Sequence, residues 1–154
     1  WMRETARERD IAICGSLIIE DYGRYFNRFL LVRADGTTEY YDKRHLFRLA
    51  GEHEHYAAGP SVQTFELKDW RIRPMVCYDL RFPVWSRNRN DYDLLVYVAN
   101  WPDRRIWDEL HLRFATADGW TPCSGGSSSG SGASVERDRC VFRGGALSAP
   151  MRRR

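Results

Sequence analysis

The sequence predicts an α/β fold that ends in a disordered tail. Two apolar runs, IAICGSLII at 11–19 and YDLLVYVAN at 92–100, are rich in β-branched residues, which is typical of strands buried on both faces. A helix-like segment precedes the first run, and a helix followed by a buried strand favours α/β layering. From residue 119 the composition changes abruptly to Gly, Ser and Arg, which predicts that the packed core stops there.

The N-terminal third carries the clearest local signals. Residues 1–9 suit the last turns of a helix, and a strand is expected at 11–19. Segment 24–43 predicts a strand, a turn and a second strand, because Asp35-Gly36 supplies the positive φ that a tight hairpin needs. We therefore expect a β-hairpin in this region.

A polar loop follows at 45–60. No hydrophobic period is sustained there, and Gly51, Gly59 and Pro60 interrupt the chain. Loops of this length often carry function. The charged residues of this loop are therefore candidates for a functional site.

Segments 61–67 and 70–79 predict an antiparallel pair joined at Lys68-Asp69. The second of these strands ends at a thiol, that of Cys77. A cysteine in such a place is usually just a small buried hydrophobe, so its surroundings decide whether it has a chemical role.

A crossover unit is predicted after that thiol. A short helix starts near Pro83, and the strand at 92–100 follows it. This order places Cys77 at the carboxyl end of a sheet strand, where such folds keep their ligands. Helical spacing of apolar residues between 106 and 117 predicts one more helix, to about Asp118.

Composition and charge exclude several classes of protein. The chain has 154 residues, of which 43% are apolar and 29% charged, enough for one globular core. The net charge of +3 owes much to the arginines at 152–154 and gives little support to nucleic-acid binding. No apolar stretch approaches the roughly 20 residues of a membrane span, and no signal peptide is visible, so we expect no membrane partner and a cytoplasmic location.

The cysteines do not suggest a framework of their own. Cys14, Cys77, Cys123 and Cys140 are far apart and form no CxxC pair, so neither a disulfide scaffold nor a zinc knuckle is predicted. Cys14 lies within an apolar run and is assigned a structural role.

Three residue types that together perform acyl transfer come from separate segments. Cys77 precedes a predicted helix, and Lys43 ends another strand, so that a nearby cation would favour the thiolate. If Glu52 or Glu54 faces the same cleft, the set becomes a thiol, an ammonium group and a carboxylate. Spacing alone leaves the choice between the two glutamates open.

Four motifs resemble the nitrilase superfamily of carbon-nitrogen hydrolases. They are YDKRHLF (41–47), EHEHYAAG (52–59), VCYDLRFPVWSRN (76–88) and YVANW (97–101), in the order and spacing of the bacterial omega-amidase-like branch. The resemblance extends over about 1–110. It implies an incomplete αββα sandwich, with a partial hydrolase domain at residues 1 to 118. Residues 119 to 154 then form a Gly/Ser/Arg-rich tail, either disordered or the product of a frame shift.

The resemblance also implies site residues. Lys43 and Cys77 correspond to two members of a Glu-Lys-Cys triad, and Glu52 corresponds to an additional family glutamate, preferred over Glu54 because it lies seven residues before Gly59. The family needs no cofactor or metal. The full-length parent is expected to be a homodimer acting on a small-molecule amide.

The implied reaction is the hydrolysis of a terminal carboxamide. Cys77 attacks the carbonyl carbon while the Tyr78 backbone N–H and Lys43 stabilise the oxyanion, ammonia leaves, and water hydrolyses the thioester to a 2-oxo acid such as 2-oxoglutarate. Arg81 and Trp101 are the candidates for holding the distal end of the substrate, because a guanidinium suits a carboxylate and an indole supplies a wall.

Two departures from the family pattern accompany the resemblance. The triad glutamate of the family lies upstream of residue 1, so we expect the 154 residues alone to be inactive or nearly so. Family character is also lost near Asp108, where the sequence continues into HLRFATADGWTPCSGG. A reading-frame slip in GC-rich DNA is one hypothesis for that change.

Alternatives remain open at this point. The chain could be a non-catalytic remnant or interaction module of the same fold. Its acyl group could come from a nitrile, a carbamoyl amine or another linear amide. A metal site is a further alternative, since imidazole and carboxylate both serve as ligands. The candidates are His45, His53, His55, Glu52 and Glu54. Residues two apart in a loop rarely form such a site alone.

Overall fold

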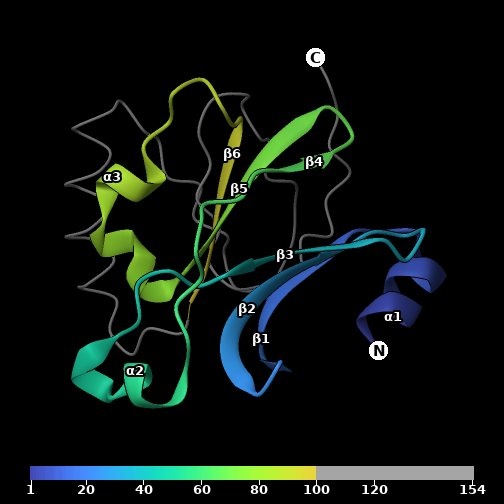
Figure 1. Ribbon diagram of the computed structural model, residues 1–154. Helices are drawn as coiled ribbons and strands as arrows, with labels where there is room; N and C mark the ends of the chain where they lie inside the picture. Colours follow the sequence, from blue (N-terminus) through green and yellow to red (C-terminus); the bar gives the residue numbers. More distant parts are fainter. Residues whose placement is uncertain (100–154) are drawn as a thin grey trace, which may run out of the picture.

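A computed structural model of the chain describes residues 1–99 (Figure 1). The elements, in chain order, are α1 (Met2–Arg9), β1 (Ile13–Asp21), β2 (Arg24–Val32), β3 (Thr38–Asp42), η1 (Arg48–Ala50), α2 (Glu52–His55), β4 (Phe65–Leu67), β5 (Trp70–Val76), η2 (Cys77–Arg81), α3 (Pro83–Ser86) and β6 (Leu94–Val98). The helix predicted up to Asp118, the tail at 119–154 and Trp101 lie outside the described residues.

The first sheet is antiparallel, in the order β1-β2-β3. A hairpin joins β2 to β3, as the sequence predicted. Gly36 has a φ of 86° in this turn, and the backbone N–H of Gly36 donates to the carbonyl oxygen of Arg33 at 2.9 Å. The Asp35 side chain accepts hydrogen bonds from the backbone N–H and the hydroxyl of Thr37, which closes the turn.

The second sheet has the order β4-β5-β6 and contains the predicted crossover. β4 and β5 are antiparallel, whereas β5 and β6 are parallel and are connected through η2 and α3. A central strand disfavours proline, yet β5 contains Pro74. β4 pairs with β5 only as far as Ile72. On the side away from β6, Pro74 therefore pairs with no strand of the described residues, and its missing N–H breaks no hydrogen bond there.

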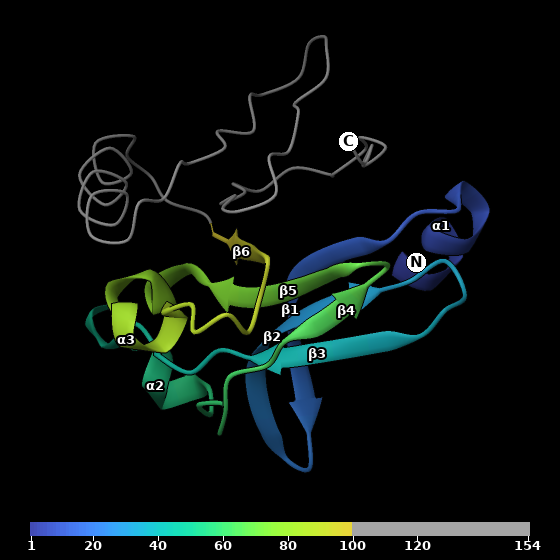
Figure 2. The ribbon, with the colours of Figure 1, turned by 90° about the horizontal axis from the view of Figure 1, so that it is seen from above.

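The two sheets face each other, and helical segments lie on their outer faces (Figures 1 and 2). Phe29, Leu31 and Tyr41 from the first sheet pack against side chains such as Val76 and Val96 from the second. A smaller cluster lies on the opposite face of the second sheet, where β5 and β6 meet η2 and α3; it comprises Met75, Leu80, Tyr92, Leu95 and Tyr97. The layers therefore follow the αββα order that the resemblance implied.

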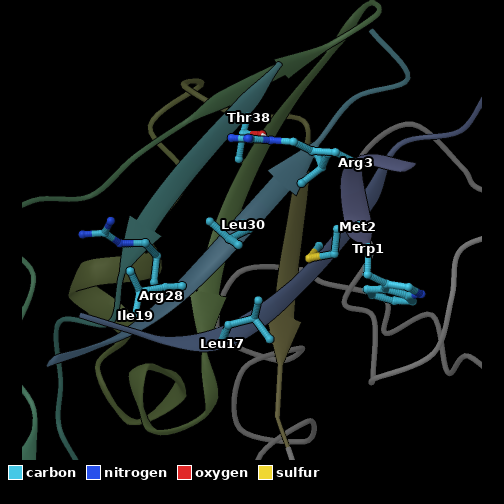
Figure 3. Close-up of a pocket in the computed structure, with 9 residues that line it drawn as sticks. Trp1, Met2, Arg3, Leu17, Ile19, Arg28, Leu30 and Thr38 are labelled. Atoms are coloured by element: carbon cyan, nitrogen blue, oxygen red, sulfur yellow. Dashed lines mark hydrogen bonds between the residues drawn. The ribbon is translucent and has the colours of Figure 1, made fainter. Parts of the chain in front are cut away.

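The outer face of the first sheet is covered only in part. α1 lies at the end of this sheet remote from α2 and α3 (Figures 1 and 2). Figure 3 shows a shallow hollow between α1 and the sheet, lined by residues that include Met2, Leu17 and Leu30. The predicted site residues do not line it.

The prediction of a doubly buried strand is right for one of the two runs and wrong for the other. In β6, successive side chains from Leu94 to Tyr97 are buried on alternate faces of the sheet. Within residues 1–99, β1 instead forms the edge of the first sheet and pairs only with β2, and Leu17 and Ile18 are 47% and 64% exposed. Its apolar run reflects an incompletely covered edge strand rather than a central one.

Gly59 fixes the path of the loop between α2 and β4. Its backbone N–H donates to the carbonyl oxygen of Lys43 at 2.9 Å, and a Cβ added there would lie 2.1 Å from the carbonyl oxygen of Asp42. Only a residue without a side chain allows this approach, which is one of the established uses of glycine. The contact anchors the loop against the end of β3.

Replacing Gly59 by alanine should therefore destabilise the protein by about 3 kcal/mol, at the upper end of overpacking penalties, because the obstacle is backbone that cannot rotate away. Urea unfolding followed by circular dichroism measures the change. Gly15→Ala is the matched control, since nothing lies within 4 Å of the corresponding Cβ position. Equal midpoints for the two variants would contradict the prediction.

Candidate active site

A buried ion pair joins the end of β3 to α2. The Lys43 Nζ lies 2.6 Å from Oε2 of Glu52, and the two side chains are only 2% and 12% exposed. Lys43 directly follows β3 and continues its ladder, because its backbone N–H donates to the carbonyl oxygen of Asn27 at 2.9 Å. Side chains alternate along extended backbone, so Lys43 shares with Tyr41 the face that looks toward the second sheet.

Glu52 is held by donors from three different segments. Besides Lys43, it accepts hydrogen bonds from the Asn27 side-chain amide at 3.1 Å and from the backbone N–H of Phe47 at 2.5 Å. It is the first residue of α2, after Gly51 in the left-handed conformation. Glu54, the alternative considered from the sequence, is exposed. The structure thus brings Glu52, and not Glu54, onto Lys43.

The charge state of Glu52 follows from these contacts. Burial alone would raise its pKa, but the hydrogen bonds from Lys43, the Phe47 N–H and Asn27 outweigh burial and lower the pKa below its ordinary value of 4.5. Glu52 is therefore a carboxylate at neutral pH. It faces a buried ammonium group as its counter-ion.

This pKa shift predicts a pH dependence of stability. Because the pKa of Glu52 is lower in the folded state, its contribution is fully present above about pH 4.5 and is lost as the pH falls through the folded-state pKa. Urea unfolding of the wild type and of Glu52→Gln at pH 7, 5 and 3.5 tests this. The stability difference between the two proteins should shrink toward low pH, and a difference independent of pH would contradict the assignment.

Cys77 occupies a strained turn at the end of β5. It has a φ of 46°, in the left-handed region that side chains rarely adopt, and it is the first residue of η2. Such a conformation costs about 1–2 kcal/mol for a residue with a Cβ. A sharp strand-to-helix turn of this kind displays a nucleophile at the end of a sheet strand. The Cys77 side chain is half-buried and packs against the core cluster between the sheets.

Asp79 links the turn of Cys77 to the segment that carries Lys43. The fully buried Asp79 carboxylate accepts hydrogen bonds from the Tyr41 hydroxyl at 2.8 Å and from the backbone N–H of His45 at 2.9 Å. Tyr41 lies two residues before Lys43, and His45 lies two residues after it. Figures 1 and 2 show that the chain leaving β3 runs along the same end of the molecule as the junction of β5 and η2.

The other predicted site residues are placed less centrally. The Tyr78 ring lies half-buried against the rings of Phe47 and Phe82, with centroid distances of 4.9 Å and 5.5 Å. Arg81 ends η2 and is exposed, and Trp101 lies outside the described residues. Within residues 1–99 no group of His, Cys, Asp and Glu side chains is arranged to hold a metal ion, and the histidines of α2 are exposed.

Sequence reasoning did not identify Asp79, Tyr41 and Asn27 as parts of this site. Asp79 stands two residues after Cys77 inside a recognised motif, and that position was the available signal. Asn27 carried no signal, because its contact with Glu52 spans 25 positions and depends on the register of β2 against β3. The contact of Asn27 with Glu52 and that of Tyr41 with Asp79 both form only in the folded chain.

Helices outside two facing sheets place the chain among the αββα sandwich proteins. The ends of β3 and β5 supply a lysine and a cysteine, and the start of α2 supplies the glutamate that pairs with the lysine. The chain belongs to the carbon-nitrogen hydrolase family, whose model matches residues 1–121. Its relatives are in the omega-amidase branch of the nitrilase superfamily, as the motifs indicated.

Three relatives illustrate the similarity. Omega-amidase YafV of Yersinia enterocolitica is 57% identical over 112 residues, which cover 71% of this chain and 44% of that protein. The 2-oxoglutaramate amidase of Bacillus subtilis is 31% identical over 71% of this chain and 45% of its own length. A crystal structure of a CN-hydrolase superfamily protein from Xanthomonas campestris is 46% identical, with a TM-score of 0.70 over 75% of this chain and 47% of that one.

The chain thus spans less than half the length of the curated relatives that it matches. In the part of the chain that the structure describes, no helix has the length and apolarity needed to cross a membrane.

Proposed function

We propose that this chain is the catalytic portion of an amidase that hydrolyses the terminal carboxamide of a small 2-oxo acid amide, such as 2-oxoglutaramate, to the acid and ammonia. Two observations carry the proposal: the buried Lys43–Glu52 pair and the strained turn of Cys77, whose chain segments are joined through hydrogen bonds to Asp79. Similarity to an omega-amidase and to a 2-oxoglutaramate amidase supports the substrate class.

The first half of the proposed reaction forms a thioester. The Cys77 sulfur attacks the carboxamide carbon, a carbon–sulfur bond forms, and the carbonyl oxygen becomes an oxyanion stabilised by Lys43 and by the backbone N–H of Tyr78. When the tetrahedral intermediate collapses, the carbon–nitrogen bond breaks. The departing nitrogen takes up the proton that the thiol released, for which the Lys43–Glu52 pair offers a route, and it leaves as ammonia.

The second half returns the enzyme to its starting state. Water attacks the thioester carbon, the carbon–sulfur bond breaks, and the acid leaves while the thiol of Cys77 is restored. The resemblance assigns activation of this water to a glutamate upstream of residue 1. Arg81, which is exposed, and Trp101 are the candidates for holding the distal end of the substrate, because a guanidinium suits a carboxylate and an indole supplies a wall.

Ammonia release by the full natural protein from a panel of compounds tests the proposed specificity. We expect 2-oxoglutaramate to be turned over at least about tenfold faster than a nitrile or a carbamoyl amine of the same length, because each requires a different fit at the reacting carbon. Cys77→Ala is the blank. A preference for the nitrile or the carbamoyl amine would retain the nucleophile but overturn the substrate class, and no cysteine-dependent product would favour a non-catalytic module.

The contribution of the upstream glutamate requires a second comparison. We expect the 154-residue chain by itself to release little ammonia, and the full natural protein that contains these residues to release it at a normal rate. Appreciable turnover by the 154 residues alone would show that the resemblance overstates the need for that glutamate.

A further inference from the structure

Asp79 is a buried carboxylate that is surrounded by hydrogen-bond donors. One oxygen, Oδ1, accepts from the backbone N–H of His45 at 2.9 Å and lies 2.8 Å from Nδ1 of the same residue. The other oxygen, Oδ2, accepts from the Tyr41 hydroxyl at 2.8 Å and from the backbone N–H of Val76 at 3.1 Å. Asp79 is 0% exposed, so water does not replace any of these partners.

The four donors come from the two chain segments that supply the proposed active site. Val76 directly precedes Cys77, and Asp79 lies two residues after it. The hydrogen bond from the Val76 N–H to Asp79 therefore spans Cys77, the residue in the left-handed conformation. Tyr41 and His45 flank Lys43 in the same way. One carboxylate thus ties the turn that carries the thiol to the strand end that carries the ammonium group.

The donor pattern requires a carboxylate rather than an amide. Each oxygen of Asp79 faces one backbone N–H, from His45 or from Val76, and a backbone N–H cannot become an acceptor. The His45 imidazole could adapt by changing tautomer, but the Tyr41 hydroxyl already accepts from the Arg44 backbone N–H and the Trp85 indole, so its own hydrogen is left for Asp79. Whichever way an asparagine is oriented, its amide nitrogen would face a backbone donor.

Aromatic packing holds the outer members of this network. The His45 ring is stacked on Phe82 with a centroid distance of 3.7 Å and an interplanar angle of 9°. The Trp85 indole N–H donates to the Tyr41 hydroxyl at 3.2 Å. Burial, followed by the charge and hydrogen bond of Asp79, raises the pKa of Tyr41 above its ordinary value, so the phenol keeps the proton that it donates.

We propose that Asp79 is a positioning residue of the amidase site, whose carboxylate sets where the Cys77 sulfur lies relative to the Lys43 ammonium group. This inference rests on the proposed function for its catalytic consequence. Its geometric content, the placement of a thiol beside a cation, can be measured without turnover. The sequence assigned no role to Asp79.

Asp79→Asn in the full natural protein is the first test. A misplacement of about 1 Å can lower a rate by about 10²-fold, so we expect kcat for 2-oxoglutaramate to fall by about that factor while KM changes by less than about threefold. Asp93→Asn is the matched control, because it makes the same chemical change in a half-buried carboxylate paired with Arg71 at the opposite end of β5. It should leave kcat unchanged.

Alkylation by iodoacetamide supplies a readout that does not depend on turnover. A cation near a thiol speeds the alkylation of that thiol, so Asp79→Asn should slow the alkylation of Cys77 at pH 7 by about tenfold. Cys14 is an internal control, because it lies in β1 against the core cluster and reports general loosening of the fold. Peptide mapping by mass spectrometry separates the two sites, and Cys14 should be unaffected.

Three results would overturn the proposal: equal kcat in the wild type and Asp79→Asn, an unchanged rate of Cys77 alkylation, or faster alkylation of Cys77 and Cys14 together. If the wild type releases no cysteine-dependent ammonia, the proposed function fails, but the alkylation rates still decide the role of Asp79. If Asp79→Asn does not fold, His45→Asn and His45→Ala replace it. Asparagine retains a donor toward Asp79, so it should keep kcat at least about tenfold above alanine, and equal losses would overturn the proposal.

Discussion

If the proposed function holds, we expect replacing Cys77 by serine to lower the rate of ammonia release on the order of 10⁴-fold, because a serine hydroxyl lacks the thiolate form that a cysteine provides. The substitution is nearly isosteric and occurs in a half-buried side chain, so the fold should survive it. A coupled ammonia assay on the full natural protein measures the loss. Residual activity above about a tenth of the wild type would remove the thiol from the reaction.

The chain provides a matched control for this experiment. Cys14→Ser makes the same change in β1, where the thiol packs against the core and burial raises its pKa, which keeps it an uncharged thiol at neutral pH. We expect its amidase activity to remain close to that of the wild type. Acid quenching during turnover should also show the mass of one acyl group on the Cys77 peptide and none on the Cys14 peptide.

Breaking the buried ion pair is the second large effect. Glu52→Gln leaves the Lys43 ammonium group, which is 2% exposed, without a counter-ion, and loss of one partner of a buried pair costs roughly 3–5 kcal/mol. The free energy of unfolding should fall by that amount at pH 7. Ammonia release should fall by about 10²-fold, since the pair that we propose stabilises the oxyanion and transfers protons is lost.

A double variant separates stability from chemistry. In the double variant Lys43→Met with Glu52→Gln, the unpaired charge is gone and the amide oxygen can still accept from the Phe47 N–H. The loss of unfolding free energy in the double variant should therefore be smaller, by at least about 1 kcal/mol, than the sum of the losses in the two single variants. Activity should stay lost. Strict additivity of the two single changes would contradict direct coupling between Lys43 and Glu52.

Asp93→Asn again serves as the reference for an ordinary ion pair. The Arg71–Asp93 pair has side chains that are 42% and 31% exposed, so its loss should cost less than about 1 kcal/mol. A loss as large as that of Glu52→Gln would mean that burial is not what makes the Lys43–Glu52 pair strong.

Local rules were sufficient for most elements of the fold. The hairpin at Asp35-Gly36 was predictable because the positive φ of Gly36 depends on the turn itself and not on distant contacts. The crossover from β5 to β6 was predictable because a helix between two apolar strands has few alternatives. The register that places Lys43 opposite Asn27 could not be predicted in this way.

β1 shows where periodicity misleads. An uninterrupted apolar run appears both in a central strand and in an edge strand whose face is partly covered, and composition does not distinguish them. The exposure of Leu17 and Ile18 follows from the assembled sheet, in which β1 has β2 as its one partner among the described strands. The neighbours of a strand are a property of the assembled sheet.

By itself the sequence determined the family and the αββα layering, and it supplied the prediction that Cys77 and Lys43 form the central pair, since these depend on motifs and on the order of elements. The resemblance already favoured Glu52 over Glu54, but only the tertiary structure showed which of the two is buried against Lys43, and only it revealed the contacts of Asp79. Two glutamates in one short loop are chemically identical along the chain. They differ once folding buries one against Lys43 and its other donors and leaves the other in water.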